Sequence, residues 1–261
     1  MNSNYLIGSD PEAFLIDKSG KIITAIGKIP GTKTEPFTIE TLGQGFGLQT
    51  DNILVEFNIP PINTQQQLLD NINRMKDFII NYLIERNFDL QLACKASAII
   101  EMDQLLDEQS FVFGCDPDFS CYTEKQNPTP ALLNPYLRSA GCHFHLGYAN
   151  PSVAKGIELI KYMDMFLGIP SILMDTDTDR RDIYGKAGSY RFQKWGVEYR
   201  VLSSHFISSN ETLTFCYNQI EKAINAFENQ MALVPKEEVL EVINNNNTNL
   251  ANHLINKFNI L

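Results

Sequence analysis

Residues 141–148 read GCHFHLGY, and they hold two of the four histidines in the 261-residue chain. In an extended strand, side chains two positions apart point to the same face. We therefore expect His143 and His145 side by side on one face of a strand, with Phe144 and Leu146 on the opposite face. Such a pair can bind a metal ion, but it is also compatible with two hydrogen-bonded, half-buried histidines. Which reading holds depends on what else converges on this strand.

Carboxylates recur on other predicted strands at the same spacing. In SDPEAFLI, Asp10 and Glu12 share a face, and in DNILVEFNI, Glu56 interrupts an apolar strand. In GVEYRVLSS, Glu198 and Arg200 share a face. Burial of a lone carboxylate is costly, so each needs a partner. A single strand with this pattern is explained by a position at the edge of the sheet, with its polar face exposed to solvent. Several together predict one concave sheet face that gathers candidate metal ligands, namely Asp10, Glu12, Glu56, His143, His145 and Glu198.

Oxygen-rich ligation with an occasional imidazole suits Mg²⁺ or Mn²⁺ better than Zn²⁺. A calcium loop is excluded for DTDTDRRDIYGK, because Arg180 occupies the sixth position, where glycine is needed, and Lys186 the twelfth, where glutamate is needed. The five cysteines lack a zinc-ribbon or CxxC spacing, which favours reduced thiols.

A cationic segment runs into the Glu198 strand. The chain has 21 Lys plus Arg and a net charge of −10, yet six cations fall between positions 180 and 200, namely Arg180, Arg181, Lys186, Arg191, Lys194 and Arg200. Arginine binds phosphate oxygens with two parallel hydrogen bonds, so the segment favours a phosphate site. The alternative is a solvated basic loop that pairs with the aspartates at 175–182.

Composition excludes several classes of partner. The net charge of −10 argues against binding of nucleic acid or anionic lipid. We find no apolar stretch approaching the ~20 residues of a membrane span and no signal-peptide pattern, so we expect a cytoplasmic protein without a membrane or nucleic-acid partner.

The order of predicted elements indicates an α+β fold with helices on one face of an antiparallel sheet. We expect a hairpin over 4–29, a loop and possible flap over 30–50, a strand stopped by Pro60–Pro61, a helix over 64–86 capped by Thr64, one strand over 139–148, a helix from Asn150–Pro151 to about 168, a polar loop over 175–191, a strand over 195–204, a helix over 211–231 capped by Asn210, and a last helical segment before Asn244.

Taken in order, GSDPEAFLI, VEFNIPP, AGCHFHLGY, RRDIYGKAGSYR and WGVEYR resemble the phage-type amidoligases, the carboxylate–amine (COOH–NH2) ligases of type 2 in the glutamine synthetase and glutamate–cysteine ligase superfamily. The resemblance covers residues 5–205. It implies one catalytic domain over 1–261, with a curved, mostly antiparallel sheet, helices on its convex face and C-terminal helices over 210–261. It also implies that ATP phosphorylates a carboxylate and that an amine then displaces the phosphate to leave an amide.

The resemblance implies roles for residues as well. Asp10 and Glu12 resemble the first-strand metal pair, with Asp10 replacing a usual glutamate, Glu56 resembles the second-strand ligand, and Glu198 the last. His143 or His145 resembles the histidine that faces metal and phosphate. Arg200, Glu198 and Arg191 are the implied catalytic residues. The implied ATP contacts are Arg180, Arg181, Lys186, Arg191, Arg200 and, from PGTK, Lys33.

Several points stay open at the level of sequence. Asp116 or Asp118 is a candidate base for the amine, although Asp-Pro-Asp also favours a simple turn. The expected substrates are a small-molecule or peptide carboxylate and an amine, in the host cytoplasm if the chain is phage-encoded, with a homo-oligomer as an option. The alternatives are a metal-dependent hydrolase that uses His-X-His and a non-catalytic nucleotide- or metal-binding relative.

Overall fold

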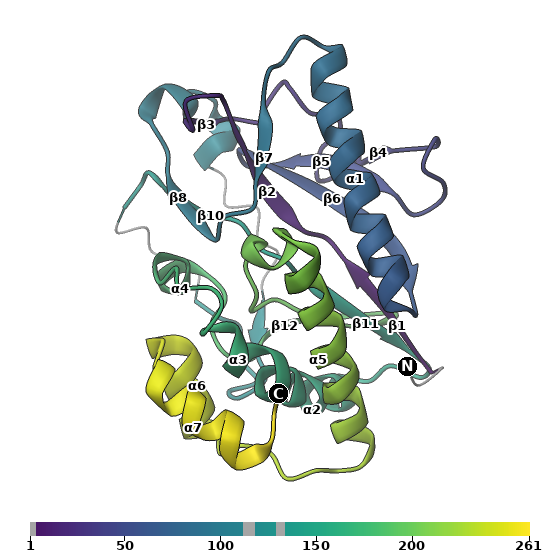
Figure 1. The fold of residues 1–261 in the computed structure, drawn as a ribbon, viewed down its shortest axis with the longest axis vertical. Coiled ribbons are helices and arrows are strands. Elements are labelled where there is room, and N and C mark those ends of the chain that lie inside the picture. Colours follow the sequence, from purple (N-terminus) through teal and green to yellow (C-terminus); the bar gives the residue numbers. More distant parts are fainter. Residues whose placement is uncertain (1–3, 112–117, 129–133) are drawn as a thin grey trace.

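The structure, a computed structural model, describes residues 4–111, 118–128 and 134–261. It confirms the expected α+β fold with a mostly antiparallel sheet (Figure 1). The main sheet has the strand order β3-β2-β6-β1-β11-β13-β12-β9, with β4, β5 and β7 paired at its side. Its strands are β1 (Tyr5–Ser9), β2 (Glu12–Ile16), β3 (Ile22–Ile23), β4 (Phe37–Thr38), β5 (Gly47–Asp51), β6 (Leu54–Ile62), β7 (Gln91–Ala93), β9 (Phe119–Ser120), β11 (Phe144–Tyr148), β12 (Ser189–Gln193) and β13 (Gly196–Tyr199).

Helices cover one face of this sheet, as Figure 1 shows for α1, α2 and α5. The helix α1 packs on β6 and β7, α2 packs on β12 and β13, and α5 contacts both helices. A separate two-stranded sheet pairs β8 (Ser97–Ile99) with β10 (Leu137–Ser139). The helices are α1 (Gln65–Glu85), α2 (Val153–Met163), α3 (Ile169–Ser171), α4 (Asp179–Ile183), α5 (Asn210–Glu228), α6 (Lys236–Asn245) and α7 (Thr248–Phe258), with 3-10 helices η1 (Met102–Gln104), η2 (Glu108–Phe111) and η4 (Ser204–Ile207) and the π-helix η3 (Asp164–Gly168). No helix in these ranges is long and apolar enough to cross a membrane.

Strand alternation separates the core from the opposite sheet face. Leu146 and Val197 are fully buried and directly opposite each other on β11 and β13. The helix α2 packs closely over this face, because a Cβ on Gly156 would lie 3.5 Å from Val197 Cβ. The intervening residues of the same strands, including His145 and Glu198, therefore point away from α2.

Two of the expected helix starts need small corrections. Thr64 caps α1 as predicted, since its side chain accepts from the backbone N–H of Gln67. The helix α2 is capped by Ser152, not by Asn150, whose φ of 51° is left-handed. The helix α5 is capped by Ser209, one residue before the predicted cap, with a reciprocal bond from Thr212.

The prediction of a loop over residues 30–50 is wrong for the C-terminal part of this range. Residues 47–51 form β5, which pairs with β6 in register, Leu48 opposite Phe57 and Thr50 opposite Val55. Glycine, glutamine and threonine form a weak β-strand pattern in the sequence. The segment becomes a strand because it pairs with buried residues of β6.

The prolines do not stop the second strand, as β6 continues to Ile62. Ile59 pairs with Ser9 and Ile62 with Ile7, and the register shifts between them. Pro60 and Pro61 fill this irregularity, where the missing proline N–H groups cost no ladder bond.

Two other segments also differ from expectation. Residues 139–148 are not one strand, because β10 pairs with β8 in the small sheet and β11 begins at Phe144 in the main sheet. The polar loop predicted over 175–191 contains the short helix α4 and the start of β12, which places Arg191 on a strand.

Candidate active site

Four neighbouring strands present one cross-strand row of side chains. Gly8 on β1 lies opposite His145 on β11, His145 lies opposite Glu198 on β13, and Glu198 lies opposite Arg191 on β12. Glycine at position 8 leaves room for the imidazole, because a Cβ on Gly8 would lie 3.3 Å from both Cβ and Nδ1 of His145. Arg191 Nη1 lies 3.5 Å from Glu198 Oε2.

Asp10, just after β1, connects both histidines, as predicted from their spacing. Its Oδ1 lies 3.2 Å from His143 Nδ1 and 3.1 Å from His145 Nε2. Glu198 Oε1 lies 3.6 Å from His143 Nδ1. Asp10, His143 and Glu198 each offer a ligand atom, and these atoms lie within 4.8 Å of one another. We call these three residues with His145 the Asp10 cluster.

Charge in the Asp10 cluster is balanced by the imidazoles. Burial alone would raise the pKa of Asp10, but His145 and His143 lower it well below its ordinary value. Burial opposes protonation of His145, yet the carboxylate of Asp10 raises the pKa of His145 above its ordinary value. A proton on His145 thus supplies positive charge that a metal ion would supply instead.

A second cross-strand row brings two carboxylates face to face. Glu12 on β2 lies directly opposite Glu56 on β6, and Gln49 on β5 lies opposite Glu56 on the other side. Gln49 Nε2 donates to Glu56 Oε2 at 2.7 Å, and Glu12 Oε2 accepts from the N–H of Gly141 at 2.6 Å. Burial, together with the charges of Asp10 and Glu12, raises the pKa of Glu56 well above its ordinary value.

Directly opposed like charges destabilise a sheet. Glu12 and Glu56 therefore form an arrangement that gains stability when a cation lies nearby. The donor set of four carboxylates and one imidazole fits Mg²⁺ or Mn²⁺, because oxygen ligands predominate. The residues that would hold the ion are Asp10, His143 and Glu198, with Glu12 and Glu56 on the adjacent strands.

Arg200 follows β13 and enters the same cluster. Its Nη1 donates to Glu198 Oε1 and lies 3.5 Å from His143 Nδ1. Burial would lower the pKa of Arg200, but Glu198 and Asp10 raise it above its ordinary value. The guanidinium is therefore a fixed positive charge beside the candidate ligands, where a phosphoryl group could contact it.

A narrow cleft of about 50 Å³ opens beside this cluster. We call it the arginine cleft, and its lining includes Glu12, Asp51, Asp118, Arg138, His143, Arg180 and Arg200. Arg180 is only 4% exposed, and its Nη2 donates to the carbonyl of Leu202 at 2.8 Å. Its Nε has no hydrogen-bond partner, so it can donate to an anion in the cleft. Burial lowers the pKa of Arg180 to about 10.

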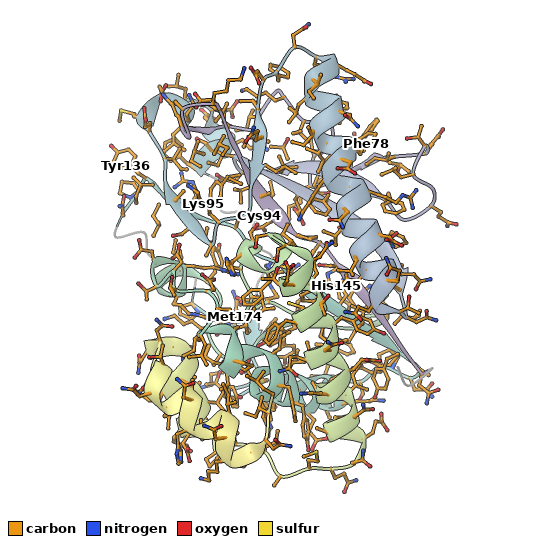
Figure 2. All side chains as sticks on the ribbon, in the orientation of Figure 1. Phe78, Cys94, Lys95, Tyr136, His145 and Met174 are labelled. Atoms are coloured by element: carbon orange, nitrogen blue, oxygen red, sulfur yellow. The ribbon has the colours of Figure 1, made fainter. Side chains whose placement is uncertain are left out.

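A second, apolar cleft lies on the His145 side. We call it the tryptophan cleft, and its lining is Leu6, Gly8, Ser9, Asn58, Ile59, Pro61, His145, Gly147 and Trp195. The Trp195 side chain is 42% exposed, and its ring centroid lies 5.0 Å from that of His145. Figure 2 labels His145 near the middle of the view, below Phe78. His143 lines the arginine cleft and His145 lines the tryptophan cleft, and both histidines contact the same oxygen of Asp10.

Other predicted contacts lie outside the clefts. Arg181 donates to the carbonyl of Gly185, Lys186 is exposed, and Lys33 Nζ lies 3.9 Å from Asp51 Oδ2 at the protein surface. Asp116 lies outside the described residues, whereas Asp118 lines the arginine cleft.

Three residues in or beside the site were not singled out as site residues in the sequence. Gln49 falls in the segment read as a loop, and Trp195 was noted only as part of a strand. Arg138 is 2% exposed on β10 and donates to the carbonyl of Ser110 at 2.7 Å. A single arginine in a short strand is a weak signal, because arginines are mostly exposed.

Comparison with known proteins agrees with the expected family. Residues 133–236 match the model of the family described as phage phiEco32-like COOH.NH2 ligase-type 2. This confirms the resemblance inferred from the motifs over the part of the chain that contains His143, His145, Glu198 and Arg200, and the family description agrees with the expected enzyme class. The motifs around Asp10 and Glu56 lie outside the matched residues. Comparison with curated proteins gives no match.

Solved structures with detectable similarity include a GmaS/ADP complex in conformation 1, with a TM-score of 0.48, 12% identity and coverage of 99% of this chain and 65% of that chain. A bifunctional glutathione synthetase from Pasteurella multocida has a TM-score of 0.46 and 9% identity, with 98% of this chain and 49% of that chain covered. A novel glutamine synthase homolog has a TM-score of 0.40 and 10% identity, with 99% and 65% covered. The chain thus spans between 49% and 65% of the length of these structures.

Proposed function

We propose that the protein is an ATP-dependent carboxylate–amine ligase that forms an amide through an acyl phosphate at a divalent-metal site. The observation that carries this proposal is the junction of two clefts at one carboxylate, since His143 lines the arginine cleft, His145 lines the tryptophan cleft, and both contact Asp10. A reaction between an anionic acid and a nucleotide needs such a junction, with positive charge where the two anions meet.

The two clefts suit different ligands. The tryptophan cleft offers an apolar lining and an exposed aromatic ring, which suit a nucleobase. The arginine cleft offers Arg180 with an unpartnered Nε, together with Arg200, which suit the carboxylate of the acid substrate. The sequence motifs alone place Arg180 on ATP phosphates, but its position in the lining of the arginine cleft favours the acid substrate.

The chemistry follows from this placement. A carboxylate oxygen of the acid attacks the γ-phosphorus of ATP, and the bond from that phosphorus to ADP breaks. The amine nitrogen then attacks the acyl carbon, the bond to phosphate breaks, and a proton leaves the nitrogen for a base. A Mg²⁺ or Mn²⁺ ion held by the Asp10 cluster would neutralise charge on the phosphate oxygens.

Each protein group has a defined task in this scheme. Arg200 stabilises charge that develops on the transferring phosphoryl group, and Glu198 holds both Arg200 and the ion in place. Asp118, which lines the arginine cleft, is the described candidate for the base.

The hydrolase alternative has less support. A zinc-type hydrolase site usually has more imidazoles, but His205 packs edge-on against Phe206 and His253 is exposed on α7. Among the described residues, the metal-ligand group contains one histidine, with the second beside it.

Release of ADP tests the proposal. The wild-type protein with Mg²⁺ and ATP is expected to release ADP only when panels of acids and amines are supplied, and Glu198→Gln is expected to abolish this release while the fold remains stable. The exposed Glu35→Gln serves as the matched control and should behave as wild type. Product formed without nucleotide would favour the hydrolase, and unchanged turnover of Glu198→Gln would remove Glu198 from the site.

A further inference from the structure

The lobe around β8 and β10 carries a group of exposed apolar side chains. The exposed fractions are 57% for Ile99, 67% for Met102, 83% for Leu106, 53% for Phe111 and 37% for Tyr136. Pairing holds these segments together, because Ile99 lies opposite Leu137 and the N–H of Ile100 donates to the carbonyl of Tyr136 at 2.9 Å. Figure 2 shows Tyr136 at the outer edge of this lobe. Apolar groups gathered in this way commonly mark an interaction site.

This surface adjoins the arginine cleft through Arg138. The Arg138 side chain lines the cleft, and its Cζ lies 5.8 Å from the ring centroid of Phe111. Asn52, also in the cleft lining, donates from Nδ2 to the carbonyl of Ser110 at 2.8 Å. The exposed surface and the arginine cleft therefore lie next to each other, with Arg138 between them.

The backbone of the lobe can also accept a partner. Within the described ranges, β8 and β10 pair only with each other, so each strand has one edge without a strand partner. An extended peptide can add to such an edge by main-chain hydrogen bonds, with its side chains alternating between the two faces.

Charge on the lobe indicates what kind of peptide fits. Residues 101–108 contain four exposed acids, namely Glu101, Asp103, Asp107 and Glu108. Lys21 is the cation paired with the first two, at 2.9 Å from Glu101 and 2.7 Å from Asp103. The excess of acid favours a partner with positive charge.

We propose that the amine substrate is a polypeptide segment of alternating basic and apolar side chains, which adds as a strand to the β8–β10 lobe and brings a lysine amine to the arginine cleft. This inference rests on the proposed ligase function and names the class of its amine substrate. The apolar side chains contact Met102 and Leu106, and the basic ones lie near the acids of residues 101–108.

The test uses a fluorescein-labelled peptide of sequence KLKLKLK and its acidic counterpart ELELELE. Fluorescence anisotropy with the full chain is expected to show binding of the basic peptide alone, weakened by added salt. The double variant Met102→Ser/Leu106→Ser, which removes apolar contact without a change in charge, should lower affinity at least tenfold. The control Ile84→Ser, which changes an apolar side chain that is 60% exposed on α1, should leave affinity unchanged.

Three results would overturn the inference: no binding of the basic peptide, equal binding of the acidic one, or an unchanged affinity in the double variant. Light scattering adds a fourth, since a dimer that the double variant abolishes would show that a second copy of the chain occupies the surface. ADP release with small amines separates the two proposals. ADP release with small amines, without any peptide binding, would refute the docking inference alone. Peptide binding by a protein that never releases ADP would refute the ligase proposal.

Discussion

Replacement of Glu56 by glutamine should stabilise the metal-free protein, although it removes a proposed ligand. Glu56 is buried directly opposite Glu12, and residues so placed have Cβ atoms about 5 Å apart. Two full charges at ~5 Å with an effective dielectric constant of ~20 repel by about 3 kcal/mol. Nearby imidazoles and Arg200 reduce this repulsion, so we expect a gain of about 1–2 kcal/mol in the free energy of unfolding.

The glutamine also suits its surroundings. Its amide oxygen can keep the bond from Gln49 Nε2, and its NH₂ group can donate to Gln49 Oε1, which has no partner in the wild-type protein. The polar contacts of Glu56 are therefore kept in the glutamine variant. The change in the free energy of unfolding comes from the loss of charge.

Thermal unfolding at pH 8.5, with EDTA and then with Mn²⁺, measures this effect. Without metal, the melting temperature of Glu56→Gln should exceed that of wild type by roughly 2–8 °C for a chain of this size. With Mn²⁺ at about 100 times its dissociation constant, wild type should gain about 2.7 kcal/mol, and the variant much less, so the order reverses. The exposed Glu35→Gln should change neither value. A less stable metal-free variant, or equal gains with Mn²⁺, would refute the reasoning.

Three further changes test other parts of the site. Arg200→Lys keeps the charge but loses the planar fork, so turnover should fall at least tenfold while Mn²⁺ affinity, measured by electron paramagnetic resonance, changes little; equal losses would count against a phosphate role. Gly8→Ala should displace His145 and lower kcat several-fold, whereas Gly156→Ala in α2, outside both clefts and with its nearest contact at 3.5 Å, should not; equal activities would show that His145 needs no fixed position. Burial raises the pKa of Asp164 to about 7, so its folded form holds a proton that the unfolded form releases. The stability of wild type should therefore fall as the pH rises from 4 to 7, and Asp164→Asn should flatten this dependence in denaturant titrations; parallel profiles would contradict the assignment.

The sequence predicted the site where strand periodicity controls it. The i, i+2 spacing placed His143 and His145 on one side of Asp10, and it placed Glu198 and Arg200 together. These residues lie on strands or directly beside strand ends, and the other face of these strands is buried, so their register cannot slip without exposing the core.

The sequence failed where tertiary contacts override local pattern. Residues 47–51 become a strand because buried residues of β6 pair with them, and this pairing brings Gln49 to Glu56. Pro60 and Pro61 remain within β6 because a register shift accommodates them. Arg181 and Lys186 share the cationic segment with Arg180, but the short helix α4 and the turn after it direct only Arg180 into the arginine cleft.

The central claim is that one divalent ion lies between Asp10, His143 and Glu198. A crystal grown with Mn²⁺ and a non-hydrolysable ATP analogue allows an anomalous difference map that locates manganese directly. We predict a peak within coordination distance, about 2.0–2.3 Å, of a carboxylate oxygen of Asp10 or Glu198 and a ring nitrogen of His143. Manganese bound elsewhere, with these three side chains left uncoordinated, would contradict the account.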